Sequence, residues 1–297
     1  MSAPLSYGIA PGGYRLPDAT ELGAVHLQVA DLARSIAYYR DVIGLRVLSS
    51  TAHNASMGPH GEERTVIELH ELRGAAPVAH RGRLGLFHVA ILLPDRASLG
   101  RFLAHLVELG ERVGMSDHMV SEALYLNDPD GLGLEVYADR PRGNWRAEGG
   151  QLAMGTEPLD ARAVIAAANG EPWTGAPAGT IVGHVHLHVG DLTQAAAFYH
   201  EGLGFDKTVW GYPGALFMSA GGYHHHLGTN TWARDAVAPA ANDARLLEWH
   251  LVVPSNDDIR ALSAHLEQKG IAAQQDGSDL LLQDPWGTRV RVVPSSR

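Results

Sequence analysis

The feature that most constrains this chain is a pattern that occurs four times along its 297 residues. Its two most similar copies read VHLQVADLARSIAYYRDVIGL, from Val25, and VHLHVGDLTQAAAFYHEGLGF, from Val185. In each copy, alternating residues lead to an aspartate, and a segment with helical spacing then runs to a glycine. Alternation predicts a strand, the aspartate predicts a helix N-cap, and the glycine predicts the end of that helix. Each copy is therefore expected to start as strand–helix.

Further strands complete each unit. In the second unit we expect a first strand from Leu84, a helix over Ser98 to Leu109, and strands near Arg112, Leu124 and Glu135. The turns DPDGLGLEV and DPWGTRVRV precede the last strands of the second and fourth units. Repetition at this level indicates an α+β fold of four βαβββ modules, arranged in two tandem domains of paired modules.

Clusters of proline and glycine set the domain organisation. Residues 141–180 are expected to form a linker with one short helix, since these residue types interrupt regular structure. The two pairs of modules would then occupy residues 22–140 and 181–297, after an extended arm over residues 1–21. A chain of this length commonly folds as about two domains.

Composition excludes several classes of function. With no cysteine, the chain has neither disulfides nor thiolate metal sites, and its 17 histidines and 33 acidic residues remain as ligands. A net charge of −10 argues against nucleic acid and anionic membranes as partners. No apolar run reaches the roughly 18 residues that a membrane span needs, and no signal peptide is evident. We therefore expect a cytoplasmic protein.

A metal site is predicted from the positions at which the four units differ. The position seven residues before each helix cap is occupied, in chain order, by Ala24, His88, His184 and Glu248. The last strand holds Glu135 in the second unit and Arg291 in the fourth. A carboxylate among leucine and valine is costly unless it is paired or binds a cation. Units one and four lack a ligand set, because alanine binds no metal and arginine repels one; Arg291 and Glu248 could instead form an ion pair.

His88, His184 and Glu135 are therefore predicted to bind one metal ion between units two and three. Two histidines and one carboxylate are the ligands of non-haem Fe(II) oxygenases. Alternation places His186 and His188 on the same strand face as His184, but only one of the three is expected to be a ligand. Taken alone, a strand histidine is more often structural, and the repeat position is what favours metal binding.

Three segments carry a resemblance to a known family: DHMVSEALYLNDPDGLGLEVYADRP, GHVHLHVGDL and SAGGYHHHLGTNTW. The chain resembles the vicinal-oxygen-chelate superfamily, and within it two-domain extradiol ring-cleavage dioxygenases of the bacillus catechol 2,3-dioxygenase type. The likeness extends from Gly23 to the last strand, and it implies that the paired modules form two tandem glyoxalase/bleomycin-resistance/dioxygenase-like domains. It implies an Fe(II) cofactor, with Mn(II) as the alternative, and a small aromatic diol and dioxygen as substrates. Association into a homo-oligomer is also common among paired-module proteins.

The resemblance also implies roles for individual residues. His88, His184 and Glu135 match the iron ligands, and Tyr125 matches a tyrosine that hydrogen-bonds a substrate oxygen. His118 matches a histidine near the substrate hydroxyl. In the HHH run, His225 fits the proton-shuttling histidine best, with His224 and His226 as alternatives. Familiar relatives hold iron between units three and four, but Glu248 and Arg291 interrupt that pairing, so the partner of unit three should be unit two.

Two other functions use the same scaffold. A glyoxalase-like isomerase or lyase with Zn or Ni generally needs a second carboxylate from the partner unit, where unit three offers only histidines. A non-catalytic small-molecule-binding protein would have no reason to keep three ligands in an apolar strand context. Because one scaffold hosts many functions, the fold alone does not separate them.

The first prediction concerns the only anionic ligand. Glu135→Gln should abolish tight metal binding, whereas Arg291→Ala should leave the metal content unchanged. Elemental analysis of anaerobically purified protein measures both. Full metal stoichiometry in the Glu135 variant would contradict the site.

Overall fold

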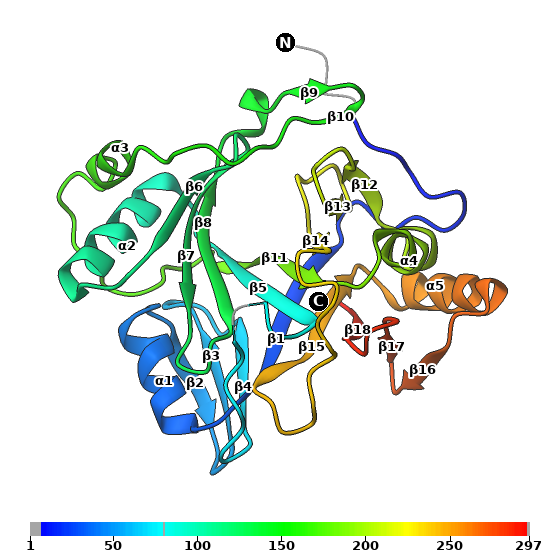
Figure 1. Ribbon diagram of the computed structural model, residues 1–297, viewed down its shortest axis with the longest axis horizontal. Coiled ribbons are helices and arrows are strands. Elements are labelled where there is room, and N and C mark those ends of the chain that lie inside the picture. The colour runs from blue at the N-terminus through cyan, green and yellow to red at the C-terminus, as the bar shows by residue number, and fades with distance from the viewer. Residues whose placement is uncertain (1–6, 80, 296–297) are drawn as a thin grey trace.

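Two eight-stranded sheets, each built from two βαβββ modules, form the centre of this α+β protein (Figure 1). The computed structural model describes residues 7–79 and 81–295. Residues 1–6 of the expected arm and the last two residues of the expected 181–297 domain lie outside this part. No helix among the described residues is both long and apolar enough to cross a bilayer.

We name the sheets by the units that they contain. Sheet 1/4 has the spatial order β16 (Ala273–Asp276), β17 (Asp279–Gln283), β18 (Arg289–Pro294), β15 (Arg245–Val253), β1 (Glu21–Val29), β4 (Ile67–Glu71), β3 (Asn54–Gly58) and β2 (Arg46–Ser50). Sheet 2/3 has the order β12 (Asp206–Val209), β13 (Ala215–Ser219), β14 (Leu227–Asn230), β11 (Ile181–His188), β5 (Gly85–Leu92), β8 (Gly133–Asp139), β7 (Ser121–Asn127) and β6 (Gly114–Asp117).

The units pair across the two halves of the chain. Antiparallel hydrogen bonds join β5 to β11 and β1 to β15, so the first strands of two units meet at the middle of each sheet. Unit three therefore pairs with unit two, as the ligand positions led us to expect, and unit one pairs with unit four. Each sheet therefore contains strands from both predicted domains, residues 22–140 and residues 181–297. These boundaries divide the sequence into two halves, and as domain limits they stay a prediction.

Helix caps show that the units share one register. The caps of the unit helices α1 (Leu32–Asp41), α2 (Arg96–Leu109), α4 (Leu192–Ala195) and α5 (Asn256–Lys269) are Asp31, Asp95, Asp191 and Ser255. Each aspartate accepts a hydrogen bond from the backbone N–H three residues on. A π-helix, η2 (Ala196–Gly202), continues α4. Left-handed glycines end α2 and α5, as glycine tolerates positive φ.

The hydrophobic core lies between the two sheets, and strand alternation decides which side chains enter it. Val25 and Leu27 of β1 and Val185 and Leu187 of β11 are fully buried in one core cluster. The residues between them face the other way, so the histidines of β11 lie on the outer, curved face of sheet 2/3. The helices flank the strands at the two sides of the molecule (Figure 1).

A pair of equivalent hydrogen bonds joins the two units within each half. The Tyr39 hydroxyl donates to Asp128 Oδ2 at 3.3 Å, and the Tyr199 hydroxyl donates to Asp284 Oδ2 at 2.9 Å. Each aspartate begins the DPDG or DPWG turn of the next unit. Burial raises the pKa of Asp128 to about 7. The helix tyrosines thus connect a helix of one sheet to a turn of the other.

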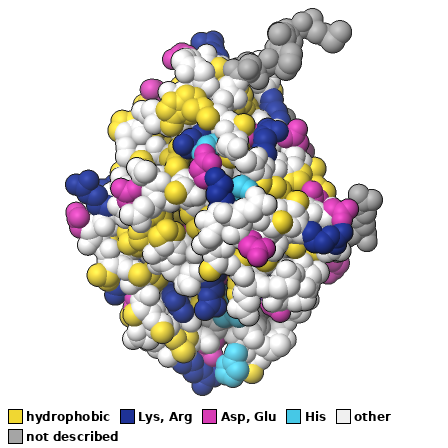
Figure 2. Space-filling view, turned by 90° about the vertical axis from the view of Figure 1, so that its right-hand side faces the viewer, with side chains coloured by type: hydrophobic (Ala, Val, Ile, Leu, Met, Phe, Trp, Pro, Cys, Tyr) yellow, Lys and Arg dark blue, Asp and Glu magenta, His cyan; other side chains and the backbone are white. Residues whose placement is uncertain are grey.

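The linker covers one end of sheet 2/3. It contains η1 (Arg142–Asn144), the short pair β9 (Ala147–Glu148) and β10 (Gln151–Leu152), and α3 (Ala161–Ala166), which falls inside the expected short helix. Figure 1 shows β9 and β10 above the ends of the strands. On the face in Figure 2, acidic and basic side chains are interspersed with apolar ones.

Close backbone approach at Gly133 generates a stability prediction. A Cβ on Gly133 would lie 2.0 Å from the Phe87 carbonyl oxygen, so alanine must push β8 away from β5. Overpacking of this kind costs about 1–3 kcal/mol, and we expect Gly133→Ala to lower the free energy of unfolding at least that much. Gly143→Ala is the control, since its Cβ would meet nothing within 4 Å. Urea denaturation should separate the two variants; equal stability would contradict the close approach.

Candidate metal centre and its cavity

Three side chains from three neighbouring strands converge at the centre of sheet 2/3. His88 Nε2 lies 3.0 Å from Glu135 Oε2, and His184 Nε2 lies 3.2 Å from the same oxygen. The three donor atoms are all within 4.8 Å of one another. The structure thus brings together the three residues that the repeat comparison selected.

Strand register explains this convergence. Ala90 of β5 lies opposite Glu135 of β8 on one side and opposite His184 of β11 on the other. His88 lies two residues before Ala90 and so shares its face. The small Ala90 side chain, fully buried, leaves space above the sheet for the three longer ones.

Burial and mutual charge set the protonation of the three groups. Burial alone would raise the pKa of Glu135, but the imidazoles of His184 and His88 outweigh it and hold this pKa well below its usual range. Burial is also the largest effect on His184 and lowers its pKa to about 4 despite the carboxylate. A carboxylate beside neutral imidazole is the protonation state that metal ligands require.

The donor set fits a divalent metal. His88 Nε2 is buried and, although it lies 3.0 Å from Glu135 Oε2, makes no well-aligned hydrogen bond to any described residue, whereas polar atoms in the interior are normally satisfied. A cation between the two imidazoles and the carboxylate would satisfy it. Two nitrogens and one oxygen suit Fe(II), Mn(II) and similar ions, and leave positions for other ligands.

The other two histidines of β11 are committed to one asparagine. Asn230 Nδ2 donates to His186 Nε2 at 3.0 Å, and His188 Nδ1 donates to Asn230 Oδ1 at 2.7 Å. Phe87 packs against both rings. His184 is thus the one member of the run whose nitrogen meets Glu135. Asn230 was not foreseen from the sequence; only its parallel register with His188 reveals it.

Sheet 1/4 contains a comparable cluster with an arginine in it. Donor atoms of His26, Glu248 and His250 lie within 4.8 Å of one another. Arg291 Nε donates to Glu248 Oε1 at 3.0 Å, which confirms the ion pair considered from the sequence. A fixed guanidinium at this distance repels a metal cation, so the cluster is internally neutralised.

A cavity of about 220 Å³ opens over the three ligands. Its walls come from both units and the linker, and the described lining residues are Phe87, His88, Ser116, His118, Tyr125, Glu135, Met154, Gly155, Thr156, His184, His186, Tyr212, Phe217, His225 and Trp232. His118, Tyr125 and His225, all selected from the resemblance, lie on this wall. His224 and His226 do not.

His118 and Tyr125 form one hydrogen-bonded unit. His118 Nδ1 lies 2.7 Å from the Gly155 carbonyl oxygen, and its Nε2 lies 2.5 Å from the Tyr125 hydroxyl. Because a carbonyl can only accept, Nδ1 carries the proton. In a neutral imidazole Nε2 is then an acceptor, so the Tyr125 O–H donates to it. The Tyr125 oxygen keeps its lone pairs for a ligand.

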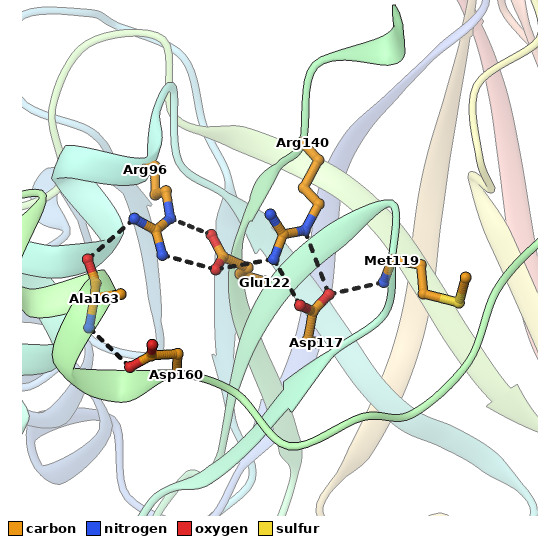
Figure 3. A network of polar contacts seen from close by, with 7 residues as sticks. All are labelled: Arg96, Asp117, Met119, Glu122, Arg140, Asp160 and Ala163. Atoms are coloured by element: carbon orange, nitrogen blue, oxygen red, sulfur yellow. Dashed lines mark hydrogen bonds and ion pairs between the residues drawn. The ribbon is translucent and has the colours of Figure 1, made fainter. Parts of the chain in front are cut away.

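A network of ion pairs holds the turn that carries His118 (Figure 3). Arg140 Nη2 lies 2.6 Å from Asp117 Oδ2 and 3.2 Å from Glu122 Oε1. Arg96 pairs with Glu122 at 2.5 Å and donates to the Ala163 carbonyl at 3.0 Å. The network therefore connects the His118 turn to both α2 and the linker helix α3.

The three histidines of the HHH run have three different surroundings. His224 Nε2 lies 2.9 Å from Asp139 Oδ1, and His224 Nδ1 lies 2.6 Å from His225 Nδ1. Asp139 can only accept, so His224 Nε2 carries a proton and its Nδ1 accepts from His225 Nδ1. His225 Nε2 is then unprotonated, and burial lowers the pKa of His225 well below its usual range.

His226 lies elsewhere. Its Nδ1 accepts from the Ala220 N–H, and the ring lines a separate cavity with Arg142 and Asp18.

Asp139, which begins the series of hydrogen bonds that leads through His224 to His225, was not selected from the sequence. The signal was available, because Asp139 is four residues after Glu135 on the same strand and therefore on the same face.

Comparisons with known proteins define the class. The model of the Glyoxalase/Bleomycin resistance protein/Dioxygenase superfamily matches residues 21–136 and 181–292. A catechol-2,3-dioxygenase of Bacillus subtilis (strain 168) is 42% identical over 270 residues, covering 90% of this chain and 94% of that protein. The chain belongs to the Glyoxalase/Bleomycin resistance protein/Dioxygenase superfamily.

Solved structures agree on the fold. A protein from Bacillus subtilis subsp. subtilis str. 168 superposes with a TM-score of 0.67 at 12% identity, covering 96% of this chain and 87% of the other. Glyoxalase I from Zea mays gives a TM-score of 0.55 at 17% identity, covering 93% and 92%. The fold is thus shared with glyoxalase I, so it does not by itself set the reaction.

The cross-unit site generates the next prediction. His88→Ala and His184→Ala should each lower metal occupancy, because each removes one of three ligands and the two lie in different halves of the chain. His26→Ala, in the arginine-neutralised cluster, is the matched control and should retain metal. Loss in only one of the first two variants would mean that one half binds the metal by itself.

Proposed function

We propose that this protein is an extradiol dioxygenase that opens the ring of catechol-like diols with Fe(II) and dioxygen. The observation that carries the proposal is the His88–Glu135–His184 set at the base of a cavity that His225 and Tyr125 also line. The 42% identity to a catechol-2,3-dioxygenase over 90% of the chain supports the same reaction.

His88, Glu135 and His184 would hold the metal ion, with Fe(II) as our proposal and Mn(II) as the alternative. When bound, such an ion supplies Lewis-acid activation of a diol and electron exchange with dioxygen. Three protein ligands leave neighbouring positions open for both substrates. The glyoxalase-like alternative needs a second carboxylate, and among the described lining residues Glu135 is the only one.

His225 and Tyr125 manage protons at the diol. His225 Nε2, kept unprotonated by the hydrogen bonds that run from Asp139 through His224, can accept a hydroxyl proton and later return it. The Tyr125 oxygen can accept a hydrogen bond from a diol hydroxyl, because its own proton is committed to His118. The two groups therefore receive protons at different places on the substrate.

The aromatic wall orients the ring and limits water. Phe87, Phe217 and Trp232 enclose His186 and the cavity from the side of unit three. A flat diol can lie against these rings with its oxygens toward the ligands.

A cytoplasmic location and association into a homo-oligomer are also part of the proposal, although neither has a role in the reaction.

Metal analysis and dioxygen uptake test the function. Protein purified anaerobically and loaded with Fe(II) should consume about one dioxygen per catechol. The ring-opened product should be yellow and can be followed by its absorbance. Uptake should be lost after chelation and return with Fe(II). Stoichiometric metal with no uptake and no ring opening would contradict the dioxygenase function.

His225→Asn separates proton transfer from metal binding. Asparagine keeps hydrogen-bonding capacity but cannot accept a proton near neutral pH, so kcat should fall about 10²–10⁴-fold while metal and diol binding persist. Single-turnover kinetics and metal analysis measure the two effects. His226→Asn, in the separate cavity, is the control. Wild-type turnover in the His225 variant would remove this residue from the mechanism.

A further inference from the structure

The cavity wall contains few charged side chains. Among the described lining residues there is no lysine and no arginine, and the one carboxylate is Glu135. The remaining polar groups are hydroxyls of Ser116, Thr156 and tyrosines, a backbone segment at Gly155, and histidines. Outside the metal ligands, the wall thus offers no permanent positive charge to a ligand.

The two arginines that follow Glu135 most closely in sequence are committed elsewhere. Arg140 is shared between Asp117 and Glu122 in the network that holds the His118 turn (Figure 3). The Arg142 guanidinium lies over the Trp145 and Tyr223 rings, at 5.4 and 5.8 Å from their centroids. Neither arginine lines the cavity. Swinging Arg140 inward would remove the cation from the half-buried Asp117 and leave Glu122 paired with Arg96 alone.

One part of the cavity wall is apolar and aromatic. Tyr212 packs edge-on against Phe217, at 5.7 Å between ring centroids, and lies 6.4 Å from Trp232. Phe87 is edge-on to Trp232 at 5.6 Å. Met154, from the linker, completes this side. A substituent that extends from a ring bound over the ligands would meet these side chains.

We propose that the cavity selects uncharged diols, with a hydrogen or an apolar substituent on the ring, and discriminates against diols that carry a carboxylate. The inference rests on the proposed function. It adds a substrate preference to that function, because binding of the diol to the metal does not by itself distinguish charged from uncharged catechols.

The physical reason is desolvation. A carboxylate that enters this cavity leaves water and finds no cationic side chain on the wall, while the charge of the bound metal is already offset by Glu135 and the diol oxygens. An alkyl substituent of similar size gains by leaving water. The difference should exceed about tenfold in affinity, which corresponds to about 1.4 kcal/mol.

A matched pair of ligands measures the effect. We would compare 4-ethylcatechol with 3,4-dihydroxyphenylacetate, because in the latter a CH₂ group separates the carboxylate from the ring and leaves the diol chemistry similar. Anaerobic calorimetry of the Fe(II)-loaded protein should show binding of 4-ethylcatechol at least about tenfold tighter. The kcat/KM ratio should show the same preference, carried mainly by KM.

A variant places a charge where the wall lacks one. Met154→Lys should raise the affinity for 3,4-dihydroxyphenylacetate relative to 4-ethylcatechol about tenfold, since it supplies a cation on a long, flexible stem. Met154→Gln is the control of similar length without the charge, and its ratio should stay near that of the wild type. Only the ratio of the affinities for the two diols is compared between variants, because both substitutions change the cavity wall.

The outcomes distinguish the two proposals. Equal or tighter binding of the carboxylated diol by the wild type would overturn the charge selection while the dioxygenase function stands. An unchanged ratio in Met154→Lys would place the substituent away from Met154 and overturn the orientation argued here. If neither diol binds or is cleaved by the metal-loaded protein, the proposed function itself fails.

Discussion

The structure of sheet 2/3 depends on a carboxylate buried in its centre. Glu135 is 2% exposed, and an unpaired charge there would cost several kcal/mol. The imidazoles of His88 and His184 approach within 3.0 and 3.2 Å and make that burial tolerable. Since each comes from a different unit, Glu135 also ties the two halves of the chain together at the site.

The two sheets neutralise their central carboxylates differently. In sheet 1/4, Glu248 meets Arg291, which also pairs with Asp276 at 2.8 Å and Asp279 at 3.2 Å. That cluster neutralises itself and has no need of a cation. In sheet 2/3 the position of Arg291 is taken by Glu135, and the neutralising charge must come from outside. Differences at the repeat positions of His88, His184 and Glu135 thus separate a structural face from the candidate metal centre.

The sequence by itself determined the modules and selected the three candidate ligands that the structure brings together. The caps at Asp31, Asp95 and Asp191 and the alternation that follows from strand geometry are local properties, so reading along the chain was sufficient. The helix over 98–109 was observed as α2, extending two residues further at its start. Strand β3 has a sequence, NASMG, with little strand propensity, and it takes its conformation from pairing with β2 and β4.

The repeat positions already indicated that units two and three meet, but only the tertiary structure decided which groups surround the candidate ligands. The HHH run lies in irregular backbone before β14, where no period applies, so its three environments depend on the packing of β8 and its Asp139. The linker supplies the Gly155 carbonyl that sets the His118 tautomer, a contact across 37 residues that spacing cannot reveal. Alternation told us which face His184 occupies, but the charge of a cavity wall is a property of many distant residues at once.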